Sequence, residues 1–454
     1  MYTPDSTASI DHPIFKAYDI RGVAPEALTP EVAYRAGRAF AVFTQAKQFV
    51  LGYDMRMSTP ALKEAFMQGA TEQGVSIWDV GMVSTDAIYY AAGKWNVPGV
   101  MITASHNPKQ YNGIKFCGAG AGAVGKESGL LDIEKLIREN TWPATATQGT
   151  VAKKELLHEY LDHVLSFVDT KDIKPLKVVA DTGNGLGGSV LPELFKRLPQ
   201  INLIPMYFDL DGNFPNHPAS PLEIENVQDA ITKVKETKAD LGLAFDGDAD
   251  RVFFIDEQGG RVTASFIIAM IVEEMLRRTP GASVVYNVVC SRIVPDTIQT
   301  NGGVALKERV GHSFIKVRMK ANHSVFGGEH SGHYYYGDNY FADSAMITVV
   351  TVLELLSRSG LTLSQLMSKY QKYFSMEETN SKVADKEAAV ARLKATYADA
   401  HTEEIDGISF TYPDFWFNVR PSNTEPLLRL NMEARTPEFL AQKSAEVLSV
   451  IRGA

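Results

Sequence analysis

A serine in a short polar loop is the first residue in this sequence whose surroundings suggest chemistry. The loop TASHNP (residues 103–108) follows the apolar run VPGVMI, which predicts a strand, and ends in Asn-Pro, which is typical of a turn. Such a loop displays side chains at the carboxyl edge of a sheet, where α/β proteins place ligand sites. Ser105 would be exposed there, with His106 beside it and Lys115 ten residues later. A serine hydroxyl is a weak nucleophile until a base or a charge activates it, so a surface turn with no chemistry is the alternative.

Three aspartates alternate in a second loop, DGDADR, which lies between the apolar runs LGLAF and VFFID. If the loop curls, three carboxylates converge, those of Asp246, Asp248 and Asp250. Converging carboxylates repel one another unless a cation holds them, and carboxylate oxygens suit Mg²⁺ or Ca²⁺. A calcium EF-hand is one alternative, because Glu257 falls at the twelfth loop position; however, Arg251 stands where an EF-hand needs glycine, and both flanks predict strands. A metal-free acidic hairpin is the other alternative.

Two further loops carry groups that suit a sugar phosphate. In GEHSGH, the glycines would let the backbone approach a ligand, Glu329 could accept two sugar hydroxyls, and Ser331 and His333 add donors. RPSNTEP begins at Arg420, whose planar guanidinium suits a phosphate, and neutral donors follow it: Ser422, Asn423 and Thr424. Taken singly, each loop is equally compatible with a polar turn.

The elements that would position these loops follow a repeated pattern. Strand, polar loop, helix and strand recur from FVLGY, from KVVA and from SVVYNVV, and such repeats predict sheets with parallel strands and helices on their faces. Near the end of the chain, ISFTYPDFWFNVR and LLRLNMEAR predict a strand pair with helical segments before and after it. We therefore expect an α/β domain with the Ser105 loop over 1–147, one with the aspartate loop over 148–257, one with GEHSGH over 258–370, and an α+β domain with RPSNTEP over 371–454.

Taken in order, the four loops resemble those of the α-D-phosphohexomutase superfamily, in its bacterial phosphomannomutase/phosphoglucomutase branch. The segments FKAYDIRG, DLDGNFPNHPASPLEIENVQD and RVGHSFIK are also similar to that branch, so the resemblance covers nearly the whole chain. It implies an α/β fold of three similar βαβ-type domains with mixed sheets and one C-terminal α+β domain around a central cleft. It also implies an enzyme, an intramolecular phosphotransferase.

The resemblance implies a role for each matching residue. Ser105 would be the phosphoserine, and its phosphate would ligate Mg²⁺ together with Asp246, Asp248 and Asp250. The other catalytic residues would be Arg21, His106, Lys115, Arg251, His312 and His333. The substrate would be bound by Tyr18, Glu329, Ser331, Arg420, Ser422, Asn423 and Thr424.

The implied reaction moves a phosphoryl group from Ser105 to the free hydroxyl of a hexose phosphate. The resulting 1,6-bisphosphate turns round and returns its other phosphate, so that mannose 6-phosphate and mannose 1-phosphate interconvert, as would the glucose pair. Hexose 1,6-bisphosphate would act as an activator, and the general base stays open among His106, Lys115 and His312. The alternatives are a phosphoglucomutase with glucose as its main substrate, a phosphoserine-dependent sugar phosphatase, and a catalytically silent sugar-phosphate-binding protein.

Composition argues against several other classes of protein. The 454 residues are 45% hydrophobic and 22% charged, which is typical of a globular chain. A net charge of −9 disfavours a nucleic-acid partner, and no apolar run approaches the roughly 20 residues that span a bilayer. Two cysteines outside any CxxC pair, and an N-terminus without a signal-peptide pattern, predict a cytoplasmic protein. The resemblance implies a monomer, with a dimer as the alternative.

Overall fold

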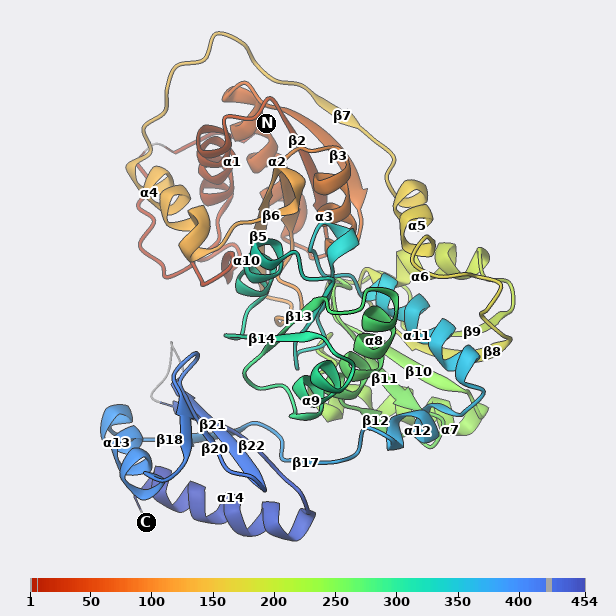
Figure 1. Cartoon of the computed structure of the whole chain (residues 1–454). Coiled ribbons are helices and arrows are strands. Elements are labelled where there is room, and N and C mark those ends of the chain that lie inside the picture. The colour runs from red at the N-terminus through yellow and green to blue at the C-terminus, as the bar shows by residue number, and fades with distance from the viewer. Residues whose placement is uncertain (1, 6, 422–426, 454) are drawn as a thin grey trace.

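The computed structural model describes residues 2–5, 7–421 and 427–453, and within them the chain forms four successive units, each built on its own sheet. In Figure 1 the first unit, red to orange, lies at the top; the second and third, yellow to cyan, lie below and beside it; and the fourth, blue, lies at the lower left. No helix within the described ranges is long and apolar enough to cross a membrane.

The first sheet is mixed, with the strand order β1-β5-β4-β2-β3-β7 and β6 beside β5. The strands β2 and β4 pair in parallel, so their carboxyl ends lie side by side. This pairing places the turn after Tyr53 next to the loop after Ile102. The elements of this unit are β1 (Ile20–Val23), α1 (Pro30–Thr44), β2 (Gln48–Tyr53), α2 (Thr59–Glu72), β3 (Ser76–Met82), α3 (Thr85–Lys94), β4 (Gly99–Ile102), β5 (Tyr111–Gly118), β6 (Gly122–Ala123), α4 (Leu131–Glu139) and β7 (Val151–Lys153).

The second sheet has the order β12-β11-β10-β8-β9, with β10 parallel to β8 and antiparallel to β11. The β10 segment LGLAF is buried at every position, as expected for a central strand covered on both faces. The elements are α5 (Leu157–Leu165), β8 (Leu176–Asp181), α6 (Gly187–Lys196), β9 (Ile201–Met206), α7 (Gln228–Thr237), β10 (Leu241–Phe245), β11 (Val252–Asp256) and β12 (Arg261–Val262).

The third sheet has the order β14-β13-β15-β16, and its first three strands are parallel. The strand β16 turns back antiparallel to β15, and the segment GEHSGH provides the last residue of β15 and the loop between them, residues 329–333. The elements are α8 (Ala264–Arg278), β13 (Ser283–Asn287), α9 (Ile293–Thr300), β14 (Val304–Glu308), α10 (His312–Asn322), β15 (Phe326–Gly328), β16 (Tyr334–Tyr336), α11 (Ala345–Ser359) and α12 (Leu363–Ser368).

The fourth sheet is built from antiparallel pairs in the order β17-β22-β21-β20-β19, with β18 also beside β22. Its α+β character confirms the prediction for this part of the chain. However, ISFTYPDFWFNVR forms two strands rather than one, because the chain reverses at Pro413, where the Tyr412 N–H donates to the Phe415 carbonyl. The elements are β17 (Phe374–Ser375), β18 (Thr379–Lys382), α13 (Lys386–Thr396), β19 (His401–Glu403), β20 (Ile408–Thr411), β21 (Phe415–Pro421), β22 (Leu427–Ala434) and α14 (Pro437–Arg452).

The predicted repeats are confirmed as β2–α2–β3, β8–α6–β9 and β13–α9–β14, in each of which a helix connects two parallel strands. One hydrophobic cluster runs beneath α3 of the first unit and through the second and third units, and includes Ile88, Leu243 and Ile268. The fourth unit has a separate core, in which Phe410 and Phe417 pack with Val447. The first three units therefore share an interior that holds their loops in fixed relation.

Candidate active site

Ser105 lies directly beyond the carboxyl end of β4 and faces the aspartate loop of the second unit. Its Oγ donates to Asp246 Oδ2 at 2.7 Å and accepts from Arg251 Nη2 at 3.0 Å. The Ser105 backbone has a φ of 51°, which is uncommon for a residue with a side chain and is typical of strained functional positions. The predicted serine and aspartate loops, which are far apart in sequence, therefore meet.

Three carboxylates converge in the loop between β10 and β11, as the alternating sequence predicts. One oxygen from each of Asp246, Asp248 and Asp250 lies within 4.8 Å of the others, and all three residues are buried. The Oδ1 atoms of Asp248 and Asp250 are buried and accept no hydrogen bond from any described residue. Oxygens of this kind are the ligands that hard cations prefer, so the donor set fits a divalent ion such as Mg²⁺.

Two buried cations balance this cluster. Lys115 Nζ donates to Asp248 Oδ2 and to Asp250 Oδ2, both at 2.7 Å. Arg251 contacts Asp246 Oδ2 through Nε at 2.9 Å and through Nη2 at 2.7 Å. Burial acts to lower the pKa of Lys115, but the two carboxylates more than offset it and hold that pKa above its usual value. Burial likewise acts to raise the pKa of Asp248, and the Lys115 ammonium holds it below its ordinary range.

His106 adjoins Ser105 and is neutral. Its Nδ1 accepts a hydrogen bond from Arg251 Nη2, and because a guanidinium can only donate, Nδ1 carries no proton. The charge of Arg251, together with burial, lowers the pKa of His106 well below its usual value. His312, on the third unit, is also buried, and burial together with the Lys316 ammonium lowers its pKa well below normal.

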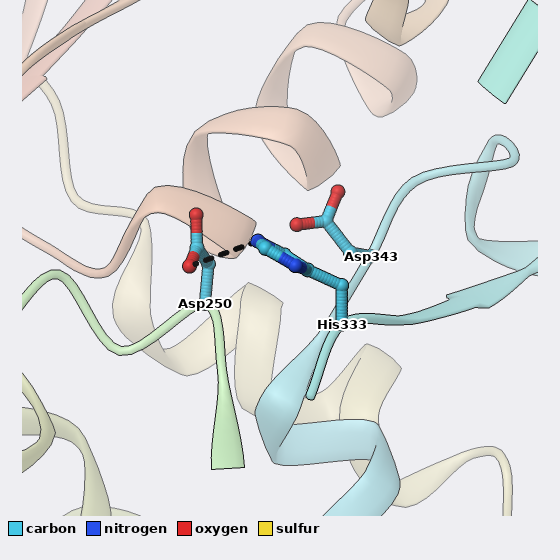
Figure 2. A group of neighbouring side chains, drawn as sticks. All are labelled: Asp250, His333 and Asp343. Carbon is cyan, nitrogen blue, oxygen red and sulfur yellow. Dashed lines mark ion pairs between the residues drawn. The ribbon is translucent and has the colours of Figure 1, made fainter. Parts of the chain in front are cut away.

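His333 lies between two carboxylates from different units. Figure 2 shows its ring between Asp250 and Asp343, with His333 Nε2 at 3.7 Å from Asp250 Oδ1. Ser331 Oγ lies 2.8 Å from the other ring nitrogen, Nδ1. Asp343 pairs with Lys316 Nζ at 2.7 Å. Although burial acts to raise the pKa of Asp343, the Lys316 ammonium and the nearby histidines lower it to about 2.

Two residues of the FKAYDIRG segment reach the same region. Arg21 Nη1 donates to Asn107 Oδ1 at 2.5 Å, so the Arg21 side chain lies against the Ser105 loop. Tyr18 donates its hydroxyl to the Val310 carbonyl at 2.9 Å, and its ring lies 5.0 Å from the His312 ring. The first unit thereby contacts the RVGHSFIK segment of the third.

Glu329 is buried and its carboxylate is already engaged by protein donors. Its Oε1 accepts from Asn287 Nδ2 at 3.1 Å and from the Gly311 N–H at 2.9 Å, and its Oε2 accepts from the Tyr335 hydroxyl at 2.5 Å. A carboxylate offers about four lone-pair positions, so one acceptor position on Oε2 is left for a ligand. The two sugar hydroxyls predicted from the sequence therefore exceed what this arrangement leaves free.

Arg420 lies at the end of β21, in the fourth unit. Its Nη2 donates to Glu378 Oε2 at 2.8 Å, and its Nε is buried without an acceptor among the described residues. Asp406 Oδ2 lies 3.7 Å from Arg420 Nη1 and accepts a hydrogen bond from the Val310 N–H at 3.1 Å. Val310 belongs to the third unit and also contacts Tyr18, so the fourth unit contacts the third at this loop. The predicted partners Ser422, Asn423 and Thr424 lie outside the described residues.

Sequence reasoning missed Thr85, which stands at the start of α3. Its Oγ1 donates to Asp248 Oδ2 at 2.6 Å, and its N–H donates to the Asp248 carbonyl at 3.0 Å. In the sequence, the segment Ser-Thr-Asp predicts only the start of a helix, because residues of these types are favoured at helix N-termini. Asp343 and Lys316 were missed as well, although Lys316 belongs to the RVGHSFIK segment.

Comparison with known proteins identifies the family. Models of the phosphoglucomutase/phosphomannomutase family match over four ranges: α/β/α domain I at 12–144, α/β/α domain II at 158–260, α/β/α domain III at 263–373 and the C-terminal domain at 378–449. A phosphomannomutase of Escherichia coli is 38% identical over 450 residues, covering 96% of this chain and 99% of its own. A phosphomannomutase/phosphoglucomutase of Pseudomonas putida is 39% identical over 439 residues, covering 94% and 93%.

A solved structure resembles the whole chain. It is a phosphoglucomutase/phosphomannomutase family protein of Burkholderia thailandensis, with a TM-score of 0.87 and 33% identity, covering 96% of this chain and 97% of that one. The resemblance predicted from the four loops is confirmed along nearly the whole chain, and so is the fold of three α/β units and one α+β unit. The chain therefore belongs to the phosphoglucomutase/phosphomannomutase family.

Proposed function

We propose that this chain is a phosphohexomutase that interconverts mannose 6-phosphate and mannose 1-phosphate, and the corresponding glucose phosphates. The observation that carries the proposal is the contact of the Ser105 hydroxyl with Asp246 and Arg251, beside a cluster of carboxylates that fits a divalent cation. A nucleophilic oxygen, a cation site and a guanidinium around one point are the parts that phosphoryl transfer requires. The full-length similarity to phosphomannomutases supports the same reaction.

In this proposal Ser105 carries the phosphoryl group, and Asp246, Asp248 and Asp250 hold Mg²⁺. When bound, the ion would supply positive charge beside the phosphoryl group and favour its transfer. Arg251 already reaches Ser105 Oγ and would contact the phosphate oxygens, and Lys115 would keep the aspartates ionised. Ser105 donates its phosphoryl group to the free hydroxyl of the hexose phosphate, and the bisphosphate turns and returns the other one.

Proton transfer to and from the sugar hydroxyl falls to a neutral imidazole. Lys115 is an ammonium held by two carboxylates, and His106 Nδ1 already accepts from Arg251, so neither is free to take a proton in this arrangement. Of the three candidates His312 remains, and its ring centroid lies 6.4 Å from that of His333. Tyr18, Arg21, Glu329 and Ser331 would line the sugar and phosphate positions.

The substrate preference is tested with the two hexose 1-phosphates. We expect both mannose 1-phosphate and glucose 1-phosphate to be converted, with kcat/KM for mannose at least equal to that for glucose. The two sugars differ at one hydroxyl, and a site that accepts most hydroxyls in common discriminates weakly. Each conversion is measured with Mg²⁺ and a trace of hexose 1,6-bisphosphate, together with any release of inorganic phosphate.

Three outcomes separate the proposal from its rivals. Stoichiometric free phosphate instead of hexose 6-phosphate would assign the chain as a sugar phosphatase. A large preference for glucose would make it a phosphoglucomutase. Binding of either sugar without turnover would leave a silent binding protein.

Arg420 is proposed to hold the phosphate that is not reacting, in both orientations of the bisphosphate. We expect Arg420→Ala to raise KM for hexose 1-phosphate and hexose 6-phosphate alike, by about 10- to 150-fold, since a charge-assisted contact contributes roughly 1.5–3 kcal/mol. The variant should also need more added bisphosphate, because the intermediate escapes more often.

The matched control is Arg429→Ala. Arg429 also binds Glu378, at 3.2 Å, but its side chain is more exposed than that of Arg420. Arg429→Ala therefore removes a neighbouring arginine of the same charge, and we expect it to change each KM by less than about threefold. A loss confined to one monophosphate in Arg420→Ala would exclude a shared remote site.

Other properties stay predictions. The family resemblance implies hexose 1,6-bisphosphate as activator and a monomeric state, with a dimer as the alternative, and the sequence predicts a cytoplasmic location. Both cysteines, Cys117 and Cys290, are buried free thiols, which is compatible with a reducing compartment.

A further inference from the structure

Arg56 is a fully buried arginine with every side-chain donor in use. Its Nε donates to Asp54 Oδ2 at 3.1 Å. The other four donors reach backbone carbonyl oxygens, those of Ser105 (2.8 Å), Asn107 (2.7 Å), Pro108 (2.9 Å) and Tyr111 (2.9 Å). A guanidinium has five N–H groups, so each one has its own acceptor, and the Arg56 side chain is 0% exposed.

Chain topology brings Arg56 to this place. The strands β2 and β4 are parallel neighbours, with Tyr53 paired to Ile102, and Arg56 follows one strand as Ser105 follows the other. The loop from Ser105 to Tyr111 therefore wraps around the Arg56 guanidinium. The four carbonyls on it belong to the segment that carries the nucleophile and to the residue that begins β5.

The Ser105 carbonyl is fixed from two sides. Arg56 Nη2 donates to it, and the backbone of Gly247 in the aspartate loop lies against it, so that a Cβ atom on Gly247 would be 2.5 Å from this oxygen. Ser105 has its positive φ at this point, a conformation that persists only where the surroundings impose it. Held in this way, the residue directs Oγ to Asp246 Oδ2.

The second unit closes over Arg56. The Phe214 ring lies 5.0 Å from the guanidinium carbon, and a Cβ atom on Gly212 would be 2.6 Å from Arg56 Cα. Water therefore has no access to replace the hydrogen bonds of Arg56. A buried donor or acceptor that loses its partner keeps the full cost of its desolvation, so changes at this residue act directly on the loop.

We propose that Arg56 is a positioning residue for the phosphoryl-carrying serine: its guanidinium fixes the backbone of the Ser105 loop so that Oγ faces Asp246 and Arg251. The proposal rests on the proposed function, because it concerns the same serine. The Arg56 side chain hydrogen-bonds to Asp54 and to four backbone carbonyls, and not to Ser105 Oγ or to the carboxylates of Asp246, Asp248 and Asp250, so it acts on the serine through the loop backbone.

Arg56→Lys tests this role because a lysine keeps the charge but has three N–H donors on one nitrogen. At least two of the five acceptors would lose their donors, and the loop would relax. A displacement of about 1 Å at a reacting atom can cost roughly 100-fold in rate. We expect the phosphorylation of Ser105 by glucose 1,6-bisphosphate, and kcat, to fall by about 10- to 100-fold, with KM for the hexose phosphates changed by less than about threefold.

Arg35→Lys is the matched control. Arg35 lies in α1 of the same unit, is 2% exposed, pairs with Glu31 at 2.6 Å and donates to the carbonyls of Asp5 and Ala8. This variant should lose comparable thermal stability while keeping wild-type phosphorylation and kcat. If Arg56→Lys lowers kcat no more than Arg35→Lys does, the effect is one of general stability and the positioning role is wrong.

Two further readouts keep the outcomes distinct. Asp54 accepts from Arg56 Nε through Oδ2 and from the Arg56 N–H and Thr59 Oγ1 through Oδ1, so the NH₂ group of Asp54→Asn faces a donor on one side and Arg56 loses one of these contacts. This variant should slow the phosphorylation of Ser105 in the same direction even if Arg56→Lys does not fold, and an unchanged rate would overturn the proposal. The phosphorus NMR signal of the phosphoserine should shift in the Arg56→Lys protein. Wild-type protein that takes no phosphate from the bisphosphate would refute the proposed function itself, whereas labelling of wild type and Arg56→Lys at equal rates would refute only the role of Arg56.

Discussion

Replacing Ser105 with alanine will reduce mutase turnover by at least about 10³-fold while the protein stays folded. Among the described residues, Ser105 Oγ is the hydroxyl that contacts both Asp246 and Arg251, and it is the proposed carrier of the phosphoryl group. Removing the nucleophile of an enzyme that works through a covalent intermediate costs up to roughly 10⁶-fold in kcat. The variant should also take up no phosphate from glucose 1,6-bisphosphate.

The fold should survive because the loss of Oγ leaves no buried group unpaired. Asp246 Oδ2 keeps two contacts from Arg251, at 2.7 and 2.9 Å, and Arg251 Nη2 keeps this carboxylate as a partner. The stability change should therefore stay near about 1 kcal/mol, the ordinary contribution of one hydrogen bond. Turnover, phosphate uptake and thermal unfolding are measured side by side.

Ser283→Ala is the matched control for this prediction. Ser283 lies at the start of β13, where its hydroxyl contacts Ser324 Oγ at 2.8 Å, and it has no part in the site. The same loss of one hydroxyl there should leave turnover unchanged. If Ser105→Ala retained turnover within tenfold of wild type, the phosphoryl carrier would have to be another residue.

Local sequence patterns were enough to predict the aspartate loop and the strands on either side of it. In DGDADR, alternation alone brings three carboxylates to one point, and the flanking apolar runs are the two strands of an antiparallel pair. The EF-hand alternative fails because the loop is flanked by strands, β10 and β11, and because both carboxylate oxygens of Glu257 accept from Ser364. Here the chemistry lies within six adjacent residues, so their types and spacing are informative.

The supporting contacts could not be predicted in this way. Arg56 acts on backbone carbonyls, which every sequence has, so nothing in the composition of the Ser105 loop marks it as the partner of an arginine. Glu329 is engaged by Asn287, Gly311 and Tyr335, and two of these lie on elements far from it in sequence. Such contacts depend on how elements that are separate in sequence pack within a unit, and a local pattern carries no signal for that.

Replacing Asp248 with asparagine will weaken Mg²⁺ binding and lower turnover even at saturating Mg²⁺. Asp248 Oδ2 accepts from Lys115 Nζ at 2.7 Å and from Thr85 Oγ1 at 2.6 Å, and Oδ1 is the oxygen left for a cation. An asparagine must turn its NH₂ either toward those two donors or toward the cation, so one side always faces a group of the wrong kind. The lost charge removes part of what a hard cation requires.

For Asp248→Asn we expect the Mg²⁺ concentration at half-maximal activity (the Mg²⁺ midpoint) to rise by at least about tenfold and the plateau rate to fall by about 100-fold. Loss of groups that support a metal site typically costs roughly 10- to 100-fold in affinity or activity, and Asp248 would be a direct ligand. The plateau falls as well because Asp250 is then the one carboxylate that Lys115 contacts, so less negative charge holds the pKa of Lys115 above its usual value and its position loosens. Activity is titrated with Mg²⁺, and the binding of Mg²⁺ alone is followed by calorimetry.

Glu274→Gln is the control for Asp248→Asn. Glu274 is a buried carboxylate in α8 that pairs with Arg277, Arg278 and Arg358, away from the aspartate loop. Neutralising it removes the same charge from a comparably buried position, so thermal stability should fall while the Mg²⁺ midpoint and the plateau rate stay at wild-type values. If the Mg²⁺ midpoint and the plateau rate are both unchanged in Asp248→Asn, Asp248 does not belong to the metal site. If the midpoint shifts equally in Glu274→Gln, the effect comes from overall charge, because the loss of a metal ligand should change the midpoint in Asp248→Asn alone.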